Sequence, residues 1–129
     1  QAVVRGKSGH LHWFVKEADG GLQHFTWGYD QVADYPVAFD YDGDGITDPA
    51  VVRTMDETYL KWFIKGYGSI FYGYAADTPV VGDFNGDGAY DLGVFRGSRG
   101  QWFIHNPSGP TIRQHYGQDG DLPVVGQSY

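Results

Sequence analysis

The sequence predicts an all-β fold assembled from repeated units of four short antiparallel strands. Aromatic residues make up 17% of the 129 residues and there are 20 glycines, a composition that favours short strands and tight turns. Runs rich in Val, Ile, Phe, Trp and Tyr alternate with turns that contain Gly, Pro, Asn or Asp. An internal repeat then indicates the number and the order of the strands.

The repeat aligns two long segments without a gap. DYPVAFDYDGDGITDPAVVR at residues 34–53 matches DTPVVGDFNGDGAYDLGVFR at residues 77–96, which lies 43 positions further along. DLPVVGQ at residues 121–127 begins a third copy, and AVVR at residues 2–5 matches AVVR at residues 50–53. The secondary structure predicted for one unit therefore applies to the matching residues of the other units.

Each unit predicts four strands in a fixed order. The first strand carries the D-x-P-V motif, an acidic loop follows it, and the second strand ends in Arg. The third strand carries WF, and the fourth ends in an aromatic residue followed by Gly. Four strands in about 45 residues are typical of a β-propeller blade. A helix over residues 51–66 is disfavoured, because the other copies have Gly-rich hairpin turns there.

Two residue types recur once in every unit. We expect the tryptophans to pack between blades, with a platform for a ligand as the alternative. We expect each arginine, held near the acidic loop of its blade, to pair with an aspartate. The tryptophans are Trp13, Trp62 and Trp102, and the arginines are Arg5, Arg53 and Arg96.

The predicted units span residues 1–33, 34–76 and 77–120 of a single module over residues 1–129, and residues 121–129 supply a first strand that completes a blade. Three blades are too few to close a propeller ring. We therefore expect two copies to close a six-bladed ring, with the C-terminal strand of each completing the first blade of the other. The alternative is a chain cut from a larger propeller.

Two acidic loops follow the first strands of the two complete units. Each has side-chain oxygens at loop positions 1, 3, 5 and 9 and glycines at positions 4 and 6. These oxygens belong to Asp40, Asp42, Asp44 and Asp48 in the first loop and to Asp83, Asn85, Asp87 and Asp91 in the second. Alternate side chains of a curling loop can converge on one centre, and the glycines permit the bends. The backbone carbonyls of Ile46 and Ala89, at position 7, would each add a neutral ligand.

All of these ligands are hard oxygen atoms, which Ca²⁺ takes in numbers of about six to eight. Transition metals would call for His or Cys. An EF-hand is excluded because its twelfth position requires Glu, whereas Val51 and Val94 stand there. The alternative is an Asx-rich turn capped by its own side chains. We predict two calcium ions per chain.

Aromatic residues that do not recur are the candidates for ligand binding. They are Trp27, Tyr29, Tyr35 and Tyr59. Exposed rings beside polar side chains suit sugars, because the C–H faces of a sugar stack on the ring while its hydroxyls form hydrogen bonds. The alternative for each ring is ordinary surface or blade packing.

Composition and motifs argue against several classes of function. The net charge of −7 argues against nucleic acid, whose phosphates require a basic face. No apolar run approaches the roughly 18 residues of a membrane span, so membrane insertion is not expected. Cysteine is absent, and no Gly-x-Ser-x-Gly elbow, P-loop or zincin motif occurs, so we expect no enzymatic activity.

The motif D-x-(D/N)-G-D-G-x-x-D after P-V, followed by a hydrophobic strand ending in Arg and by WFI, resembles the FG-GAP or VCBS-type repeat. That repeat is found in integrin-α-like β-propellers, in propeller lectins and in modules of secreted bacterial proteins. The resemblance covers essentially the whole chain and implies calcium in both acidic loops. The third copy departs from the motif, because Gln127 stands where the first ligand belongs, so no third site is expected.

Together these features predict a secreted, calcium-stabilised β-propeller module that binds glycans. Secretion follows from the calcium supply, because weak extracellular calcium sites would stay empty at cytosolic calcium levels. The alternatives are a structural or protein-interaction propeller module, and an excised or engineered propeller fragment that self-assembles.

Overall fold

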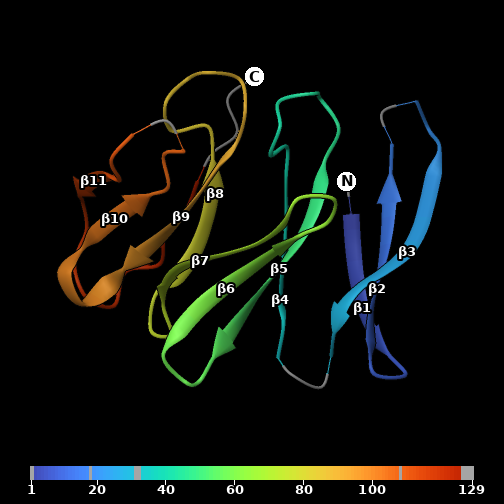
Figure 1. Cartoon of the computed structure of the whole chain (residues 1–129), viewed down its shortest axis with the longest axis horizontal. Helices are drawn as coiled ribbons and strands as arrows, with labels where there is room; N and C mark the ends of the chain where they lie inside the picture. The colour runs from blue at the N-terminus through green and yellow to red at the C-terminus, as the bar shows by residue number, and fades with distance from the viewer. Residues whose placement is uncertain (1, 18, 31–32, 108, 126–129) are drawn as a thin grey trace.

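A computed structural model describes residues 2–17, 19–30, 33–107 and 109–125. Three antiparallel sheets stand side by side along the molecule (Figure 1). The predicted all-β class is confirmed: the described residues form strands and the short 3-10 turn Gly97–Arg99, and they form no α-helix. The same part of the chain has no helix with the length and apolar character needed to cross a membrane.

Each sheet is a meander in which strands adjacent in sequence are hydrogen-bonded neighbours. The first sheet contains β1 (Ala2–Lys7), β2 (His10–Lys16) and β3 (Leu22–Tyr29). The second contains β4 (Tyr35–Phe39), β5 (Asp48–Met55), β6 (Tyr59–Ile64) and β7 (Gly68–Tyr74). The third contains β8 (Thr78–Gly82), β9 (Asp91–Arg96), β10 (Gln101–Ile104) and β11 (Ile112–His115).

The second and third sheets have the four strands expected of a unit, and they share one register. Tyr35 of β4 is opposite Val52 of β5, and Thr78 of β8 is opposite Phe95 of β9. The first sheet has three strands and no counterpart of β4 or β8 among the described residues. Residues 121–125, in which that type of strand was expected to begin, are described without strand structure, and the rest of that segment lies outside the described residues.

Two of the repeated tryptophans pack between neighbouring sheets, as expected. Trp13 of β2 packs in one cluster with Val51 of β5, and Trp62 of β6 packs in another with Leu92 of β9. Both indoles are almost fully buried. Trp102 in the third sheet is only partly buried, because no further sheet covers it in the described part of the chain.

The tryptophans also tie the strand that carries them to the last strand of the same sheet or to the residue that follows it. The indole N–H of Trp13 donates to the Trp27 carbonyl at 2.9 Å. The indole N–H of Trp62 donates to the Tyr72 carbonyl at 3.0 Å, and the third tryptophan makes the same bond in its own sheet. A buried indole that found no acceptor would cost free energy, so these bonds explain why Trp is suited to this position.

Glycine is required where one sheet approaches the next. Gly28 and Gly73 end the aromatic–Gly pairs of β3 and β7, and their φ angles are +93° and +98°. A Cβ atom on Gly28 would lie 2.7 Å from Val51 Cγ1, and one on Gly73 would lie 2.6 Å from Val94 Cγ1. Both the backbone conformation and the missing side chain therefore permit the close contact.

We expect Gly73→Ala to lower the free energy of unfolding by about 2 kcal/mol, because alanine is strained at positive φ and its methyl group meets Val94. Gly66→Ala is the matched control: its φ is +89°, but a Cβ there meets no atom within 4 Å. Urea unfolding of both variants separates the two costs. If both variants lose the same free energy of unfolding, the close approach of the sheets at Gly73 does not contribute to stability.

Candidate functional site

The two acidic loops lie at the same end of the molecule and touch each other. One joins β4 to β5 and the other joins β8 to β9, both at the top of Figure 1. The Tyr90 N–H donates to the Asp40 carbonyl at 2.8 Å. A Cβ atom on Gly43 would lie 3.4 Å from the Cβ of Ala89, so the loops are in van der Waals contact. Two sites in these loops would therefore be neighbours.

In the first loop, the carboxylate at position 1 folds the chain around itself. Asp40 Oδ1 accepts hydrogen bonds from the Gly43 N–H at 2.9 Å and from the Asp44 N–H at 3.2 Å. Asp40 Oδ2 accepts from the Gly45 N–H at 2.8 Å. These bonds hold the curl that the loop needs, with or without an ion.

The second loop repeats the same bonds. Asp83 Oδ1 accepts from the Gly86 N–H at 2.8 Å and from the Asp87 N–H at 3.1 Å, and Asp83 Oδ2 accepts from the Gly88 N–H at 3.0 Å. The two loops have the same residue types at the same spacing, so the same side-chain to backbone bonds form in both. These bonds are compatible with an ion site and with a turn capped by its own side chains.

The carboxylate at position 9 closes each loop onto its start. Asp48 Oδ2 accepts from the Tyr41 N–H at 2.9 Å, and Asp91 Oδ2 accepts from the Phe84 N–H at 3.1 Å. Each of these carboxylates has a second oxygen that can face an ion. The position-9 ligand is therefore held by the second strand of its sheet, which starts at that residue.

Carboxylates converge in the first loop. Asp40, Asp42 and Asp48 each offer an oxygen, and these oxygens lie within 4.8 Å of one another. The second loop carries Asn85 where the first has Asp42, so an amide oxygen replaces one carboxylate there. This donor set of carboxylate and amide oxygens fits a hard cation such as Ca²⁺.

The remaining predicted ligands lie at positions 5 and 7. The Asp44 carboxylate accepts from the Ile46 N–H at 2.8 Å, and the Asp87 carboxylate accepts from the Ala89 N–H at 2.9 Å. Asp44 is not part of the converging group of Asp40, Asp42 and Asp48, so the roles of positions 5 and 7 stay predictions. Gln127, which was expected to end the ligand pattern of the third copy, lies outside the described residues.

One carboxyl group in each loop has a raised pKa. Burial, with a further contribution from neighbouring loop carboxylates, raises the pKa of Asp48 and of Asp91. A raised carboxyl pKa means that the charged form is less favoured there than in water. A cation beside these two carboxylates would favour the charged form again.

Tyr67 is a residue of the first loop region that sequence reasoning missed. It lies in the turn between β6 and β7, and its hydroxyl donates to the Asp42 carboxylate. That bond lowers the pKa of Asp42 and raises the pKa of Tyr67 to about 12. No repeat marks this position, since Pro107 is its counterpart in the next unit, so the sequence contained no signal for it.

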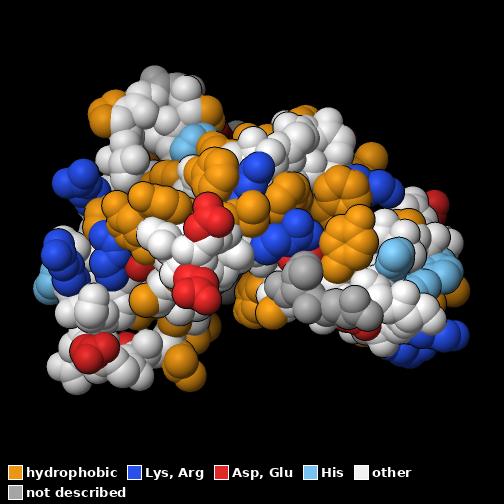
Figure 2. Space-filling model, turned by 60° about the horizontal axis from the view of Figure 1, so that its bottom comes forward, with side chains coloured by type: hydrophobic (Ala, Val, Ile, Leu, Met, Phe, Trp, Pro, Cys, Tyr) orange, Lys and Arg blue, Asp and Glu red, His pale blue; other side chains and the backbone are white. Residues whose placement is uncertain are grey.

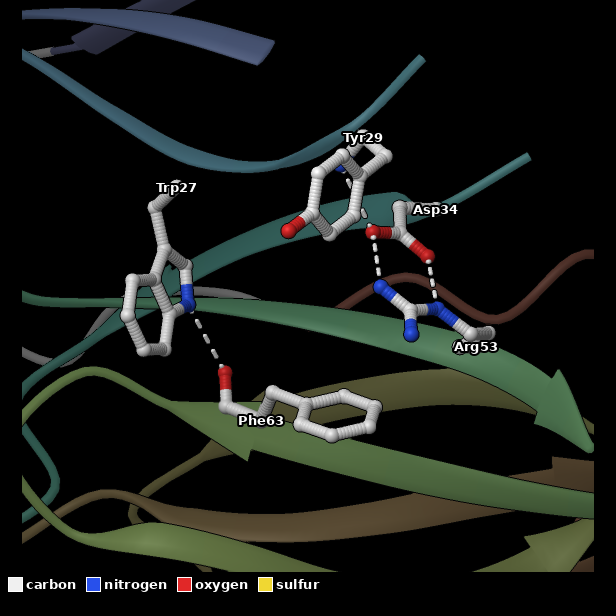
Figure 3. A network of polar contacts seen from close by, with 5 residues as sticks. All are labelled: Trp27, Tyr29, Asp34, Arg53 and Phe63. Atoms are coloured by element: carbon white, nitrogen blue, oxygen red, sulfur yellow. Dashed lines mark hydrogen bonds and ion pairs between the residues drawn. The ribbon is translucent and has the colours of Figure 1, made fainter. Parts of the chain in front are cut away.

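The junction between the first and second sheets contains a pocket at the opposite end of the molecule. Its volume is about 310 Å³, and its lining includes Trp27, Tyr29 and Arg53. The indole of Trp27 crosses from β3 and donates its N–H to the Phe63 carbonyl of β6 at 3.0 Å (Figure 3). Two of the four predicted ligand-binding aromatics are thus brought together here.

Arg53, which lines this pocket, is held in place by an ion pair. Arg53 Nε and Nη2 donate to the two oxygens of Asp34 at 2.7 and 2.8 Å, and the Tyr29 N–H donates to the same carboxylate at 2.9 Å (Figure 3). The expected pairing with an aspartate is found, but the expected position near the acidic loop is wrong, because Asp34 belongs to the D-x-P-V motif. The reason is the register of β4 and β5, which places Asp34 beside Arg53 at the far end from the loop.

The guanidinium also stacks on aromatic rings. The Cζ atom of Arg53 lies 4.7 Å from the centre of the Phe63 ring and 5.6 Å from that of the Tyr29 ring. Nε and Nη2 bind Asp34, so Nη1 is the guanidinium nitrogen that this ion pair does not use, and Arg53 is among the residues that line the pocket. The pocket therefore combines the hydrogen-bond donors of Arg53 with the aromatic rings of Tyr29 and Phe63.

The junction between the second and third sheets repeats the arrangement. A pocket of about 370 Å³ is lined by Tyr59, Tyr72, Tyr74, Arg96 and Phe103, among others. Arg96 donates to both oxygens of Asp77 at 2.9 Å, as its counterpart does in the first junction. Tyr35, the fourth predicted aromatic, is exposed on β4 and lines neither pocket.

The surface at this end of the sheets mixes apolar and basic groups. Figure 2 shows hydrophobic side chains interleaved with Lys and Arg across the middle of the molecule. Such a surface suits a ligand that has both apolar faces and hydrogen-bonding groups.

The fold and the sites define an all-β protein of three sheets with two paired acidic loops and two matching junction pockets. No protein-family model, no curated protein and no solved structure matches the chain.

Proposed function

We propose that the chain is a non-enzymatic, calcium-stabilised β-propeller module that binds carbohydrate outside the cell. Its motifs resemble those of FG-GAP or VCBS-type repeats. The observation that carries the carbohydrate proposal is the pair of junction pockets, which present tyrosine rings and a braced arginine at equivalent positions. Each proposed blade is a four-stranded sheet or, in the first sheet, part of one.

Calcium is the proposed ion because the donor set is made of hard oxygens and nothing softer. The ligands are proposed to be the side chains at loop positions 1, 3, 5 and 9 and the carbonyls of Ile46 and Ala89, which makes two ions per chain. When bound, calcium supplies positive charge to each loop. The residues of the chain would hold the loop curl and supply the oxygen ligands.

The junction pockets suit sugars for a chemical reason. A pyranose has C–H faces that stack on rings such as Tyr29 and Tyr74, and hydroxyls that could accept from the Nη1 groups of Arg53 and Arg96, which the ion pairs with Asp34 and Asp77 do not use. Each pocket is shallow, so a single site would bind weakly. Two sites on one chain would raise the apparent affinity for a multivalent glycan.

We expect Tyr29→Ser and Tyr74→Ser each to weaken binding on a glycan array by about 10-fold or more, because the avidity of paired sites is lost. Tyr35→Ser is the matched control: this ring is similarly exposed but lines neither pocket. Circular dichroism of all three variants would verify that the fold is kept.

Two results would contradict the carbohydrate proposal. One is an array on which the native protein binds no glycan at any printed density. The other is equal loss of binding in all three variants, which would place the site elsewhere. Capture of a protein partner together with a silent array would favour the interaction-module alternative.

A further inference from the structure

The two junction pockets share an arginine held by an ion pair, but they differ in charge. In the second pocket, the buried carboxylate of Asp77 offsets the charge of Arg96. Arg113 of β11 also lines this pocket, and it forms no ion pair with any residue that the structure describes. No Asp or Glu is among the described residues that line the pocket. The carboxylates of the second acidic loop lie at the other end of β9, which begins at Asp91 and ends at Arg96.

Arg113 has no equivalent in the first pocket. It pairs with Phe103 of the neighbouring strand, as Ser69 pairs with Phe63 in the second sheet. Ser69 is therefore its counterpart, and this serine is not among the residues that line the first pocket. A junction between two sheets thus forms without an arginine at this position, so the charge of Arg113 is not needed to build one.

Two guanidinium groups lie beside one aromatic ring in the second pocket. The Cζ atom of Arg96 is 4.5 Å from the centre of the Phe103 ring, and that of Arg113 is 5.8 Å from it. The ion pair with Asp77 uses Nε and Nη2 of Arg96, so it leaves Nη1 unused. Guanidinium groups match the geometry of carboxylate and sulfate oxygens, so this pair suits an oxyanion.

The same pocket contains a hydroxyl group without a partner. The Tyr72 hydroxyl oxygen is buried, and although Thr111 lies beside it, no hydrogen bond of normal geometry joins the two hydroxyls. Trp27, the counterpart of Tyr72 in the first sheet, donates to a backbone carbonyl instead. Burial raises the pKa of Tyr72, so its hydroxyl keeps its proton and can donate, and both Arg96 and Arg113 lie near enough to act on its charge. A buried hydroxyl without a partner costs free energy, which an acceptor on a ligand would recover.

We propose that the second junction pocket selects glycans that carry an anionic group, either a carboxylate or a sulfate ester. This inference rests on the proposed carbohydrate binding and names the substrate class of one of its two sites. Arg113 supplies the cation, and Arg96 Nη1 and the Tyr72 hydroxyl donate hydrogen bonds to the anion. The sugar ring stacks on Tyr74, which lines the same pocket. The first pocket has no counterpart of Arg113 and takes neutral sugars.

A glycan array with matched neutral and acidic members tests the inference, in calcium buffer at constant ionic strength. The array carries glycans that end in glucuronic acid or in glucose, and glycans that end in N-acetylglucosamine with or without a 6-sulfate. We expect the native protein to bind each acidic member about 10-fold more tightly than its neutral match, because charge-assisted hydrogen bonds are stronger than neutral ones. Arg113→Ser, which copies the residue of the first junction, is expected to remove this preference and to leave the binding of neutral members unchanged.

Two further variants separate the local contact from a general effect of charge. Arg99→Ser is the matched control, because this exposed arginine lines neither junction pocket and its loss changes the net charge by the same amount. Tyr72→Phe removes only the hydroxyl and is expected to reduce the preference by about 3-fold. Circular dichroism of the three variants verifies that the fold is kept.

The failure of this inference differs from the failure of the carbohydrate proposal. Equal binding of acidic and neutral glycans by the native protein overturns the inference alone, whereas binding to no glycan contradicts both. A preference that survives in Arg113→Ser also overturns it, because the anion is then held elsewhere, as through calcium in the acidic loops. Competition with sodium sulfate is expected to remove the preference and to spare the neutral members, and a preference that sulfate leaves intact would contradict the proposed anion contact.

Discussion

Chelating calcium with EGTA is expected to lower the melting temperature by roughly 10 °C or more, the largest effect that we predict. A ligand that binds only the folded state stabilises it by RT ln(1 + [L]/Kd). With dissociation constants of about 10⁻⁴–10⁻³ M and about 10 mM calcium, two sites contribute about 3–5 kcal/mol. The raised pKa of Asp48 and Asp91 acts in the same direction, because a cation bound beside these carboxylates would favour their charged forms.

Scanning calorimetry with and without calcium measures this effect. In the double variant Asp40→Asn with Asp83→Asn, the difference between the two conditions is expected to disappear. Thr47→Ala is the control, because this exposed loop residue is not a predicted ligand and should keep the full difference. A native protein that melts at the same temperature in EGTA and in calcium would remove the metal proposal.

Asp34→Asn is expected to lower the free energy of unfolding by about 3 kcal/mol, because it breaks a buried ion pair and leaves the arginine unpaired. The asparagine has nearly the same shape, but it cannot accept two charge-assisted bonds from Arg53. Arg53 remains partly exposed, with a side-chain exposure of 24%, which places the cost at the lower end of the usual range.

A double-mutant cycle with Arg53→Met isolates the pair. Asp34→Asn should cost clearly less when Arg53 is already absent, and urea unfolding measures both costs. Asp19→Asn is the control, because its exposed carboxylate accepts one backbone N–H, from Gly21, and meets no arginine. Additive costs around the cycle would mean that the pair contributes nothing as a pair.

The strand pattern could be predicted from the sequence because it depends on local chemistry. Runs of β-branched and aromatic residues favour strands, and the Gly and Asp residues between them favour turns. The four-stranded units from Asp34 to Gly117 therefore appear where the repeat placed them. The buried tryptophans were predictable for a similar reason, since a side chain of that size recurring at one position requires the same packing each time.

The partner of each repeated arginine was not predictable in the same way. Arg53 is five residues from Asp48 and 19 from Asp34, and sequence distance favoured the acidic loop. The antiparallel register of β4 and β5 reverses this order, because it carries Asp34 alongside Arg53 and leaves the loop at the other end of the sheet. Tyr67 shows the same limit, since its bond to Asp42 joins two turns that have no sequence relation.

The order of residues was enough to define the all-β class, the units and the candidate ion ligands, because strand pairing and loop curls are set by residues close together in the chain. The tertiary structure decided which aromatic rings contact an arginine, which aspartate side chains are buried and which apolar side chains stay exposed. Those outcomes depend on contacts between sheets, such as Gly28 against Val51, where shape and distance matter and sequence spacing does not.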